Sequence, residues 1–537
     1  MDESAGHSST TSDWDWIVVG SGFGGSVAAL RLSEKGYRVL VVEQGPRWRA
    51  QDFPRTNWNL RRWLWMPKLG FRGIFRMSFF RHLTVFSGVG VGGGSLVYAN
   101  TLPTPGKSFF SHPAWKHLAE DWEQELSPHY ATAKSMLGVT PTPFRTPPDE
   151  ALAAVAQKQS EPASFQATEV GVFFGEPGVA VADPYFDGEG PEREGCQRCG
   201  ACMIGCPHRA KNSLDLNYLY LAERRGCQIR ANTRVIALRP HAAGGYAVEC
   251  ASSQAPRPWR RRPKPQQLHA KHGVMLAAGV LGSNQLLLQM QQQPDGLPQL
   301  SNQLGQNIRT NAEAFLGVTT SRKDLGEGVA IGSILKTDEH SHLEPVRYPS
   351  GSGFFRLLMV PYADGKNLLV RFGKSLGRFL RHPLRWSKAF LVRDWAASTS
   401  ILMAMRTLDT SLALRLKRNG ALRTDLGSGQ APSASLPDMA KLAEQVAEEL
   451  DGVVGGILPE MILGIPSTAH VLGGCPMGKN AQDGVIGPDH QVHGYPGLYV
   501  VDGAAMPANP GVNPSLTITA LAERALSAIP ANTTSSC

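Results

Sequence analysis

The chain has 537 residues, with 54 lysines and arginines against 45 aspartates and glutamates, which gives a formal net charge of +9. Hydrophobic residues make up 42% of the chain and charged residues 18%, a balance that excludes intrinsically disordered and fibrous proteins. Because one domain typically holds about 100–200 residues, the length predicts at least two domains or one large composite domain.

The N-terminal segment MDESAGHSSTTSDWDW has neither the basic residues nor the apolar run of a secretory signal. No apolar run elsewhere reaches the about 18 residues that a membrane-spanning helix needs. We therefore expect a cytoplasmic protein without a transmembrane segment.

The first predicted elements form a β–α–β unit. A short apolar strand begins near Trp14 and runs into GSGFGG, which places Gly20, Gly22 and Gly25 in a G-x-G-x-x-G frame. A helix follows, and then a second strand that ends at Glu43. In this context the glycines permit a tight turn, close approach of a pyrophosphate and close helix–strand packing, while the acidic side chain binds a ribose. The unit predicts a dinucleotide-binding site.

A glycine-rich segment, GVGVGGGSLVYAN, follows at residues 88–100. Flexible linkers are rich in serine and other polar residues, whereas valine and leucine alternate with the glycines here. We therefore expect its backbone to approach a large flat ligand closely, with Gly92, Gly93 and Ser95 among the contacts.

Four of the eight cysteines, Cys196, Cys199, Cys202 and Cys206, form a C-x2-C-x2-C-x3-C-P run. This run is typical of bacterial iron–sulfur proteins, in which the fourth cysteine can bind a second cluster. The chain has no second run, so all four cysteines would have to bind one site. An iron–sulfur cluster, a zinc ion and a metal-free loop are the three alternatives.

Residues 366–393 contain basic but no acidic residues and predict an amphipathic helix. The basic side chains that share one face are Arg371, Lys374, Arg378, Arg381 and Arg385. The roughly opposite face carries Leu368, Phe372, Leu376, Phe379 and Leu380. Pro383 is expected to break or kink the helix near its end. The helix either covers a domain with its charges in water or docks on an anionic membrane surface. No nucleic-acid-binding module is recognisable, so nucleic acid is not an expected partner.

Three polar residues stand near glycine turns at the C-terminal end. His470 precedes Gly473 and Gly474, Asp502 ends the predicted strand LYVVD, and Asn513 precedes a predicted helix. Neutral imidazole is suited to take or orient a hydroxyl proton. An asparagine at a helix start is often an N-cap.

Together these motifs resemble those of the glucose–methanol–choline (GMC) flavoprotein oxidoreductases. The similar segments are GSGFGG with Glu43, GVGVGGGSLVYAN, AAGVLGSNQLLL, HVLGGCPMG and LYVVDGAAMPANPGVNPSLTITALAER. Within the family the chain is most similar to the bacterial cholesterol oxidase branch of mycobacterial type. The segments that carry this closer likeness include RLSEKGYRVLVVEQGPRW, VGVFFG, DPYF and HLEPVRYP.

The resemblance implies an α/β fold with a composite, Rossmann-like FAD-binding domain and an α+β substrate-binding domain. The FAD-binding segments would be residues 13–106, 191–310, which include the cysteine run, and 461–530. Residues 107–190 would form a cap and part of the substrate domain, and residues 311–460 the substrate-binding domain.

The resemblance also implies roles for single residues. His470 and Asn513 match the pair that family members place beside the flavin. Glu344, in HLEPVRYP, matches the carboxylate with which sterol oxidases move a proton during isomerisation. Asp502 is placed to bind the cofactor, and the helix after Asn513 would stabilise negative charge on reduced flavin.

The implied activity is oxidation of the 3β-hydroxyl of a sterol such as cholesterol, by hydride transfer to FAD, with 5-ene to 4-ene isomerisation and oxygen as acceptor. The alternative is a dehydrogenase of another sterol or bulky lipid alcohol that passes electrons through an iron–sulfur cluster to a protein or quinone. A flavoprotein that only binds lipid is disfavoured, because His470 and Asn513 occur together. Since a sterol is nearly insoluble in water, peripheral contact with an anionic membrane is also expected.

Overall fold

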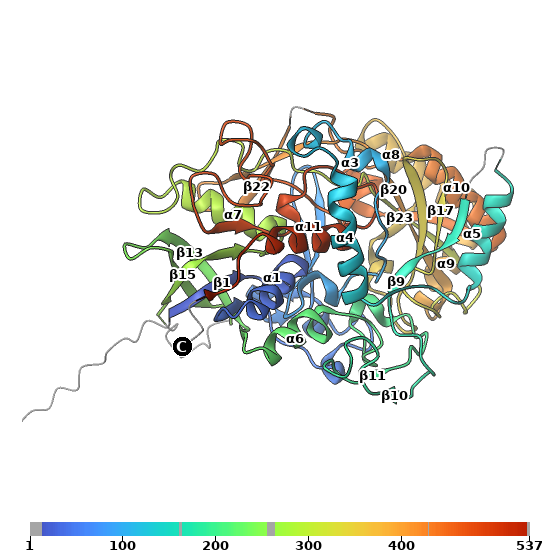
Figure 1. The fold of residues 1–537 in the computed structure, drawn as a ribbon. Coiled ribbons are helices and arrows are strands. Elements are labelled where there is room, and N and C mark those ends of the chain that lie inside the picture. The colour runs from blue at the N-terminus through green and yellow to red at the C-terminus, as the bar shows by residue number, and fades with distance from the viewer. Residues whose placement is uncertain (1–12, 160–163, 255–263, 428, 534–537) are drawn as a thin grey trace, which may run out of the picture.

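The computed structural model describes residues 13–159, 164–254, 264–427 and 429–533. Most of the N-terminal segment, on which the expected absence of a secretory signal rests, lies outside these residues. Two seven-stranded sheets lie side by side and dominate the molecule (Figure 1). Helices cover both sheets, and segments from distant parts of the sequence contribute to each.

The first sheet is built around the predicted β–α–β unit. Its strands are β12 (Gln228–Arg230), β2 (Val39–Val42), β1 (Asp13–Val19), β15 (Gln266–Leu276), β14 (Tyr246–Ser252) and β13 (Thr233–Pro240) in that order, with β25 (Leu498–Val500) also paired to β15. Strands β12, β2, β1, β15 and β25 run parallel to one another. Strand β14 is antiparallel to β15, and β13 is antiparallel to β14. Three separate stretches of the chain thus meet in one sheet, which confirms the predicted α/β class.

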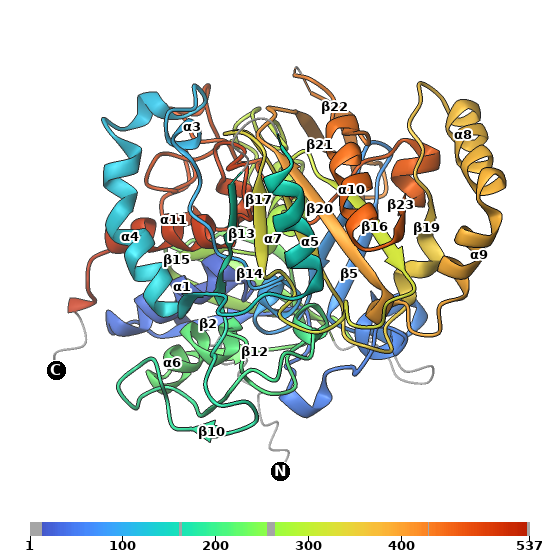
Figure 2. The same ribbon diagram turned by 90° about the vertical axis from the view of Figure 1, so that its right-hand side faces the viewer.

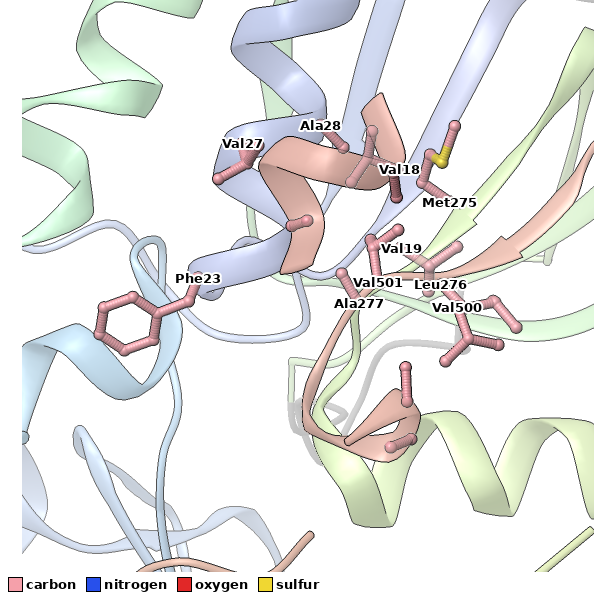
Figure 3. Close-up of a cluster of buried hydrophobic side chains, with 14 of the residues drawn as sticks. Val18, Val19, Phe23, Val27, Ala28, Met275, Leu276, Ala277, Val500 and Val501 are labelled. Carbon is pink, nitrogen blue, oxygen red and sulfur yellow. The ribbon is translucent and has the colours of Figure 1, made fainter. Parts of the chain in front are cut away.

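The parallel strands are apolar because both of their faces are covered. Figure 3 shows Val18 and Val19 of β1, Met275 and Leu276 of β15, and Val500 of β25 in one buried cluster. These residues lie at the carboxyl ends of their strands. In open α/β sheets this edge is where ligands bind.

Helices surround the first sheet. Helix α1 (Phe23–Glu34) packs against β1 and β2, and against α6 (Tyr218–Arg224) and α11 (Ser515–Ser527). Helix α4 (Trp122–Met136) packs on α11, and α7 (Gly279–Gln291) packs on β13. The N-terminal end of α1 is thereby fixed at the edge where the parallel strands end.

The second sheet is antiparallel. Its order is β19 (Met359–Pro361), β23 (Gly452–Ile457), β16 (Ala314–Thr320), β20 (Thr399–Arg406), β18 (Ser341–Val346), β17 (Ser333–Lys336) and β8 (Ser164–Ala167). Helices α5 (Pro147–Gln157) and α10 (Pro437–Glu449) pack on it and on each other. Strand β8 brings part of the 107–190 segment into this sheet, while the five predicted domain boundaries stay a prediction.

Shorter elements connect the two sheets. The small sheets are β5 (Phe75–Phe79) with β6 (Thr84–Gly88) and β24 (Ser467–Thr468), β3 (Trp65–Met66) with β4 (Phe71–Arg72), β7 (Val139–Pro141) with β9 (Glu169–Gly171), β10 (Ala180–Val181) with β11 (Arg193–Glu194), and β21 (Leu412–Leu416) with β22 (Leu422–Leu426). Two further short helices are α2 (Leu60–Trp63) and α3 (Lys107–Phe110).

Two helices occupy the predicted amphipathic segment at one edge of the molecule (Figure 2). Helix α8 (Leu368–Arg381) ends before His382, and Pro383 is the first residue of α9 (Pro383–Leu391), so the predicted break is confirmed. In the described part of the chain, no helix combines the length and apolar character that spanning a bilayer requires.

Helix α8 packs on β19 and on residues 459–463, as a covering helix would, but most large apolar side chains of its predicted apolar face are exposed. On the inner side Ser375 is buried, Lys374 pairs with Asp364 at 2.8 Å, and Arg378 pairs with Glu444 at 3.2 Å. The large apolar side chains exposed on these two helices are Leu368, Leu369, Val370, Phe372, Leu376, Leu380, Leu384 and Leu391. Lys374 and Arg378 therefore contact acidic residues of the body, and most of the large apolar side chains are turned to water.

Candidate functional site

A cavity of about 460 Å³ lies between the two sheets. One part of its wall is the glycine turn at the end of β1, the end of β2 and the start of α1. Another part consists of apolar side chains of the second sheet, which are Phe315, Leu316, Val346, Ile401, Met403 and Ile457. The cavity is therefore large enough for a drug-sized ligand and mostly apolar on one side.

The predicted dinucleotide turn forms part of this wall through Gly20, Gly22 and Glu43. Gly20 has a φ of +100°, and a Cβ there would lie 2.2 Å from the carbonyl oxygen of Ala277. A Cβ on Gly22 would meet no atom within 4 Å, so this residue borders open space. Helix α1 begins directly after Gly22, which leaves its N-terminal N–H groups available to an anionic ligand.

Glu43 is buried at the end of β2 and is already hydrogen-bonded. It accepts hydrogen bonds from Ser21 Oγ at 2.7 Å and from the Gly45 N–H at 2.7 Å. Burial raises the pKa of its carboxyl group, and these hydrogen bonds oppose that effect. Its contact with a ribose stays a prediction.

The other predicted glycine and serine contacts fall into two groups. Gly93 lines the cavity, whereas Gly25, Gly92 and Ser95 do not. A Cβ on Gly25 would lie 2.2 Å from the carbonyl oxygen of Gly20, so this glycine permits close helix–strand packing. Ser95 Oγ donates to the carbonyl oxygen of Gly92 at 2.7 Å, which fixes the glycine-rich turn. Gly92 and Ser95 thus support the glycine-rich turn that lines the cavity without lining it themselves.

Two arginines at the wall were not predicted from the sequence. Arg76 and Arg234 both line the cavity near Glu43. Burial is the main cause that lowers the pKa of Arg76 to about 10, and repulsion from Arg234 adds to it. Both guanidinium groups suit a ligand that carries phosphates. Isolated arginines in a basic chain give no sequence signal of this role.

Asp502 follows β25 and lines the cavity as expected. Its carboxylate accepts hydrogen bonds from Ser283 Oγ at 2.6 Å and from the Ala504 N–H at 2.8 Å. Burial raises the pKa of Asp502 to about 6, against the effect of these donors. Cofactor binding by this residue stays a prediction.

His470 also lines the cavity, and a buried carboxylate lies beside it. His470 Nδ1 is 2.8 Å from Glu313 Oε1. Glu313 in turn accepts hydrogen bonds from Thr468 Oγ1 and the Ala469 N–H, each at 2.7 Å. Burial alone would lower the pKa of His470, but the carboxylate of Glu313 and, more weakly, that of Glu344 raise it above the ordinary value.

Asn513 lines the same cavity and contacts the third predicted catalytic residue. Its Nδ2 lies 3.4 Å from Glu344 Oε2, and Glu344 Oε1 lies 3.6 Å from His342 Nε2. Glu344 is completely buried behind Asn513 and does not border the cavity itself. Asn513 does not cap α11, because Pro514 holds the N-cap position. The structure thus brings His470, Asn513 and Glu344 together.

These residues fit a bound FAD. The open space at Gly22 and the start of α1 suit a pyrophosphate, and Glu43 suits a ribose. Asn513 Oδ1 is buried with no hydrogen-bond partner among the described residues, so it has an unused acceptor at the cavity wall. The imidazole ring of His470 lies at the wall of the same cavity.

Two acidic residues near His470 were missed in the sequence. Glu313 positions His470, and Glu460, which is completely buried, interacts electrostatically with Glu313. Burial raises the pKa of Glu460 well above its ordinary value. The sequence feature that could have indicated a buried acid is the position of Glu313 among the apolar residues of NAEAFLG.

The four cysteines of the predicted metal motif line a second, small cavity. Among the described residues, no three Cys, His, Asp or Glu side chains form a group that could hold a metal ion. Neither the iron–sulfur alternative nor the zinc alternative therefore has support in the structure.

Comparisons with known proteins agree with this geometry. A model of an NAD(P)-binding Rossmann-like domain matches residues 18–83, and two models described as GMC oxidoreductase match residues 190–310 and 458–522. A cholesterol oxidase of Acinetobacter baumannii is 41% identical, over 97% of this chain and 95% of that protein. A cholesterol oxidase of Mycobacterium tuberculosis is 42% identical, over 96% of this chain and 91% of that protein.

A solved structure shares the fold. The crystal structure of pyridoxine 4-oxidase from Mesorbium loti is similar with a TM-score of 0.60, over 96% of this chain and 98% of that one. Its sequence identity is only 16%, so this similarity concerns the architecture alone.

Proposed function

The chain belongs to the GMC oxidoreductase family, and from this membership and the cavity we propose that it oxidises the 3β-hydroxyl of a sterol such as cholesterol to the ketone. As a member of this family it is an FAD-dependent oxidoreductase that acts on CH–OH groups. The sterol is proposed because the two relatives that are about two-fifths identical over nearly the whole chain are both cholesterol oxidases.

The observation that carries the proposal is that His470 and Asn513 line the same cavity as the apolar side chains of the second sheet. The apolar side chains of the second sheet suit a rigid hydrocarbon such as a sterol ring system. The two polar side chains suit its single hydroxyl group. A polar sugar would leave this wall poorly matched.

The proposed role of His470 is to orient the hydroxyl group and to accept its proton. Since Nδ1 lies 2.8 Å from Glu313 Oε1, the proposal assigns the proton of the neutral ring to Nδ1, which leaves Nε2 as the acceptor. Glu313 then stabilises the imidazolium that forms after proton transfer. When bound, FAD supplies the acceptor for the hydride that leaves the carbinol carbon.

The proposed role of Glu344 is to move a proton from C4 to C6 when the product is a 5-ene ketone. A buried carboxylate next to a substrate is suited to such a transfer. Its contact with Asn513 at 3.4 Å places it behind the cavity wall, so a small shift of Asn513 would expose it to the substrate.

The exposed apolar face of α8 and α9 supports delivery of the sterol from a lipid surface. Helix α8 packs on β19 and on residues 459–463, next to Met359 and Ile457 of the cavity wall. Leu369 and Leu380 are 79% and 65% exposed. Amphipathic helices with such a face lie in the membrane interface. We place the entry of the sterol on this side of the molecule.

Oxygen is the proposed electron acceptor, in keeping with the two oxidases that resemble the chain. The second candidate is a dehydrogenase of a sterol or another bulky lipid alcohol that transfers electrons to a protein or quinone. The cavity lined by four cysteines is the feature that favours it.

The proposal is tested by mixing the purified flavoprotein with cholesterol without oxygen and following the bleaching of the flavin. His470→Ala and Asn513→Ala should each slow this bleaching about 10²–10⁴-fold while FAD stays bound. His340→Ala, which changes an exposed histidine, is the matched control and should react at the parent rate. Unchanged bleaching in either active-site variant, or no bleaching of the parent by sterols, would contradict the proposal.

A further inference from the structure

We propose that His342 is a positioning residue for Glu344, which it holds as an ionised carboxylate directed at the substrate. The inference rests on the proposed role of Glu344 in moving a proton from C4 to C6. His342 Nε2 lies 3.6 Å from Glu344 Oε1, and the second oxygen of Glu344 lies 3.4 Å from Asn513 Nδ2. Glu344 is thus flanked by an amide that lines the cavity and by an imidazole that does not.

Strand β18 places the two side chains on one face of the second sheet. Side chains two residues apart in a strand point to the same face, so His342, Glu344 and Val346 form a row. Their partners across β20, in the same order, are Met405, Met403 and Ile401. Val346, Met403 and Ile401 line the cavity. The row therefore borders the cavity at Val346 and continues through Glu344 to His342.

The two facing polar atoms of this pair are buried and unused. Glu344 is completely buried and His342 is nearly so. Among the described residues, neither Glu344 Oε1 nor His342 Nε2 has a hydrogen-bond partner. A buried carboxylate is costly in its ionised form unless it is hydrogen-bonded or paired. Because the two unused atoms are 3.6 Å apart, each offers the other the partner that it lacks.

The surroundings of the pair are apolar. Val346, Met403 and Met405 belong to one cluster of buried hydrophobic residues. Met405, which is paired opposite His342, offers the ring only a thioether, and this group is a weak acceptor. In such a medium a hydrogen bond is stronger than in water, and an unpaired polar group costs more. A contact between His342 and Glu344 is therefore favoured.

The proposed step uses no further reactant. Glu344 takes a proton from C4 of the 5-ene ketone, the electron pair of that C–H bond passes into a dienolate, and the proton returns at C6. His342 keeps its own proton, which the proposal assigns to Nε2, and donates this N–H to Glu344. A separation of 3.6 Å is too long for a hydrogen bond. Such catalytic contacts are often long without substrate and shorten when it binds.

The test follows isomerisation directly. The flavin-loaded protein is given the unconjugated 5-ene ketone, and the ultraviolet absorbance of the conjugated product is recorded, so the assay does not depend on the oxidation step. His342→Leu, which removes the donor, should slow isomerisation about 10–100-fold, the effect of losing a hydrogen bond to a charged group. His342→Gln, whose amide nitrogen can replace Nε2, should stay within about threefold of the parent. His340→Leu, at an exposed histidine, is the matched control and should match the parent.

A double-mutant cycle separates positioning from a purely structural role. Glu344→Gln by itself should slow isomerisation strongly. In this background His342→Leu should add less than about a threefold loss, because its effect passes through the carboxylate that is already absent. A further loss as large as that in the parent background would show that His342 only supports the fold and would overturn the proposal.

Flavin content, measured on the same samples, shows that each variant has folded. If His342→Leu fails to bind flavin, His342→Met replaces it with the same expectation, because methionine adapts to irregular spaces. Parent-rate isomerisation in His342→Leu, with slow isomerisation in Glu344→Gln, would overturn the role of His342 alone. Equal losses in His342→Leu and His342→Gln would also overturn it, because the donor would then not matter. Isomerisation that Glu344→Gln leaves unchanged would overturn the proposed role of Glu344 and this inference with it.

Discussion

His470 and Glu313 form a buried pair, with Nδ1 and Oε1 2.8 Å apart, although 157 positions separate them in the chain. Glu313 lies just before β16 of the second sheet, and His470 lies just after β24. The proposed proton acceptor therefore lies beside a carboxylate from a distant segment of the chain. Any change in how β16 and β24 meet would alter this contact.

This pair predicts a specific shift of the pH profile. The carboxylate of Glu313 favours the protonated ring and so raises the pKa of His470. Only the neutral ring can accept the hydroxyl proton, so activity is lost as the pH falls through this pKa. Glu313→Gln removes the charge and should lower the pKa of His470. The acidic limb of the kcat profile should then move to lower pH, even though kcat itself decreases because the ring is held less firmly.

The profile is measured by steady-state oxidation of detergent-dispersed sterol between pH 5 and 9. His342→Gln, which changes the ring beside Glu344, serves as a comparison. An acidic limb that stays in place in Glu313→Gln would show that another group controls activity in this range.

A second prediction separates the two proposed chemical steps. Glu344→Gln keeps an amide that Asn513 can still contact but removes the group that moves the proton. Oxidation should persist, whereas isomerisation should slow by about 10²-fold or more. The unconjugated 3-ketone should then accumulate, which chromatography of the products detects. Conjugated product at the parent rate would mean that a different base acts.

Local sequence patterns predicted the β–α–β unit because all the residues that define it lie close together in the chain. Alternation of apolar residues, three glycines and Glu43 define two strands and the turn between them within about thirty residues. The structure confirms this unit, with β1 and β2 parallel and in register from Trp16 to Val19. The contact of Glu313 with His470 escaped prediction because it depends on how distant segments meet.

The amphipathic segment is a second case in which a local pattern could not predict contacts with distant residues. Spacing predicted the helix, its two faces and the break at Pro383. It did not predict which face meets the protein, because that depends on Asp364 and Glu444, which lie outside the helix. Charged residues are normally on the water side of a helix. Here Lys374 and Arg378 pair with acidic residues of the body, while large apolar side chains of the helix are also exposed to water.

A third prediction concerns stability in acid. His490 is buried, its Nδ1 lies 2.8 Å from the carbonyl oxygen of Val500, and burial lowers its pKa to about 4. In the unfolded chain the pKa of a histidine is about 6.5, so the unfolded state takes up a proton first as the pH falls. The contribution of neutral His490 to the free energy of unfolding is therefore present above about pH 6.5. It is lost as the pH falls from there to about 4. By pH 5 the loss should be about 2 kcal/mol.

Guanidinium unfolding at pH 7.5 and pH 5 measures this loss. His490→Asn retains a side-chain donor for Val500 but cannot be protonated, so its stability should depend less on pH than that of the parent. His340→Asn, at an exposed site, should behave as the parent does. Equal pH dependence in His490→Asn and the parent would contradict the assignment.

The last prediction tests the exposed face of α8 as a lipid-binding surface. Leu369 and Leu380 are replaced together by serine, which leaves the ion pairs of Lys374 and Arg378 intact. Burial of one leucine contributes about 1.5–3 kcal/mol, so even partial insertion of both predicts at least tenfold weaker binding to vesicles. Turnover of sterol in vesicles should fall in parallel. Turnover of detergent-dispersed sterol should change little, because neither leucine borders the cavity.

The matched control replaces two leucines by serine away from this face, at the exposed positions Leu69 and Leu426. Vesicle binding is measured by flotation with neutral and anionic lipids. If the apolar face makes the contact, both lipids should bind, because Lys374 and Arg378 are paired with acidic residues of the protein, and the anionic lipid should have a modest advantage. Equal losses of turnover with vesicles and with detergent would mean that the leucines support the fold instead. Binding that requires anionic lipid and survives the serine changes would mean that charge, rather than the apolar face, makes the contact.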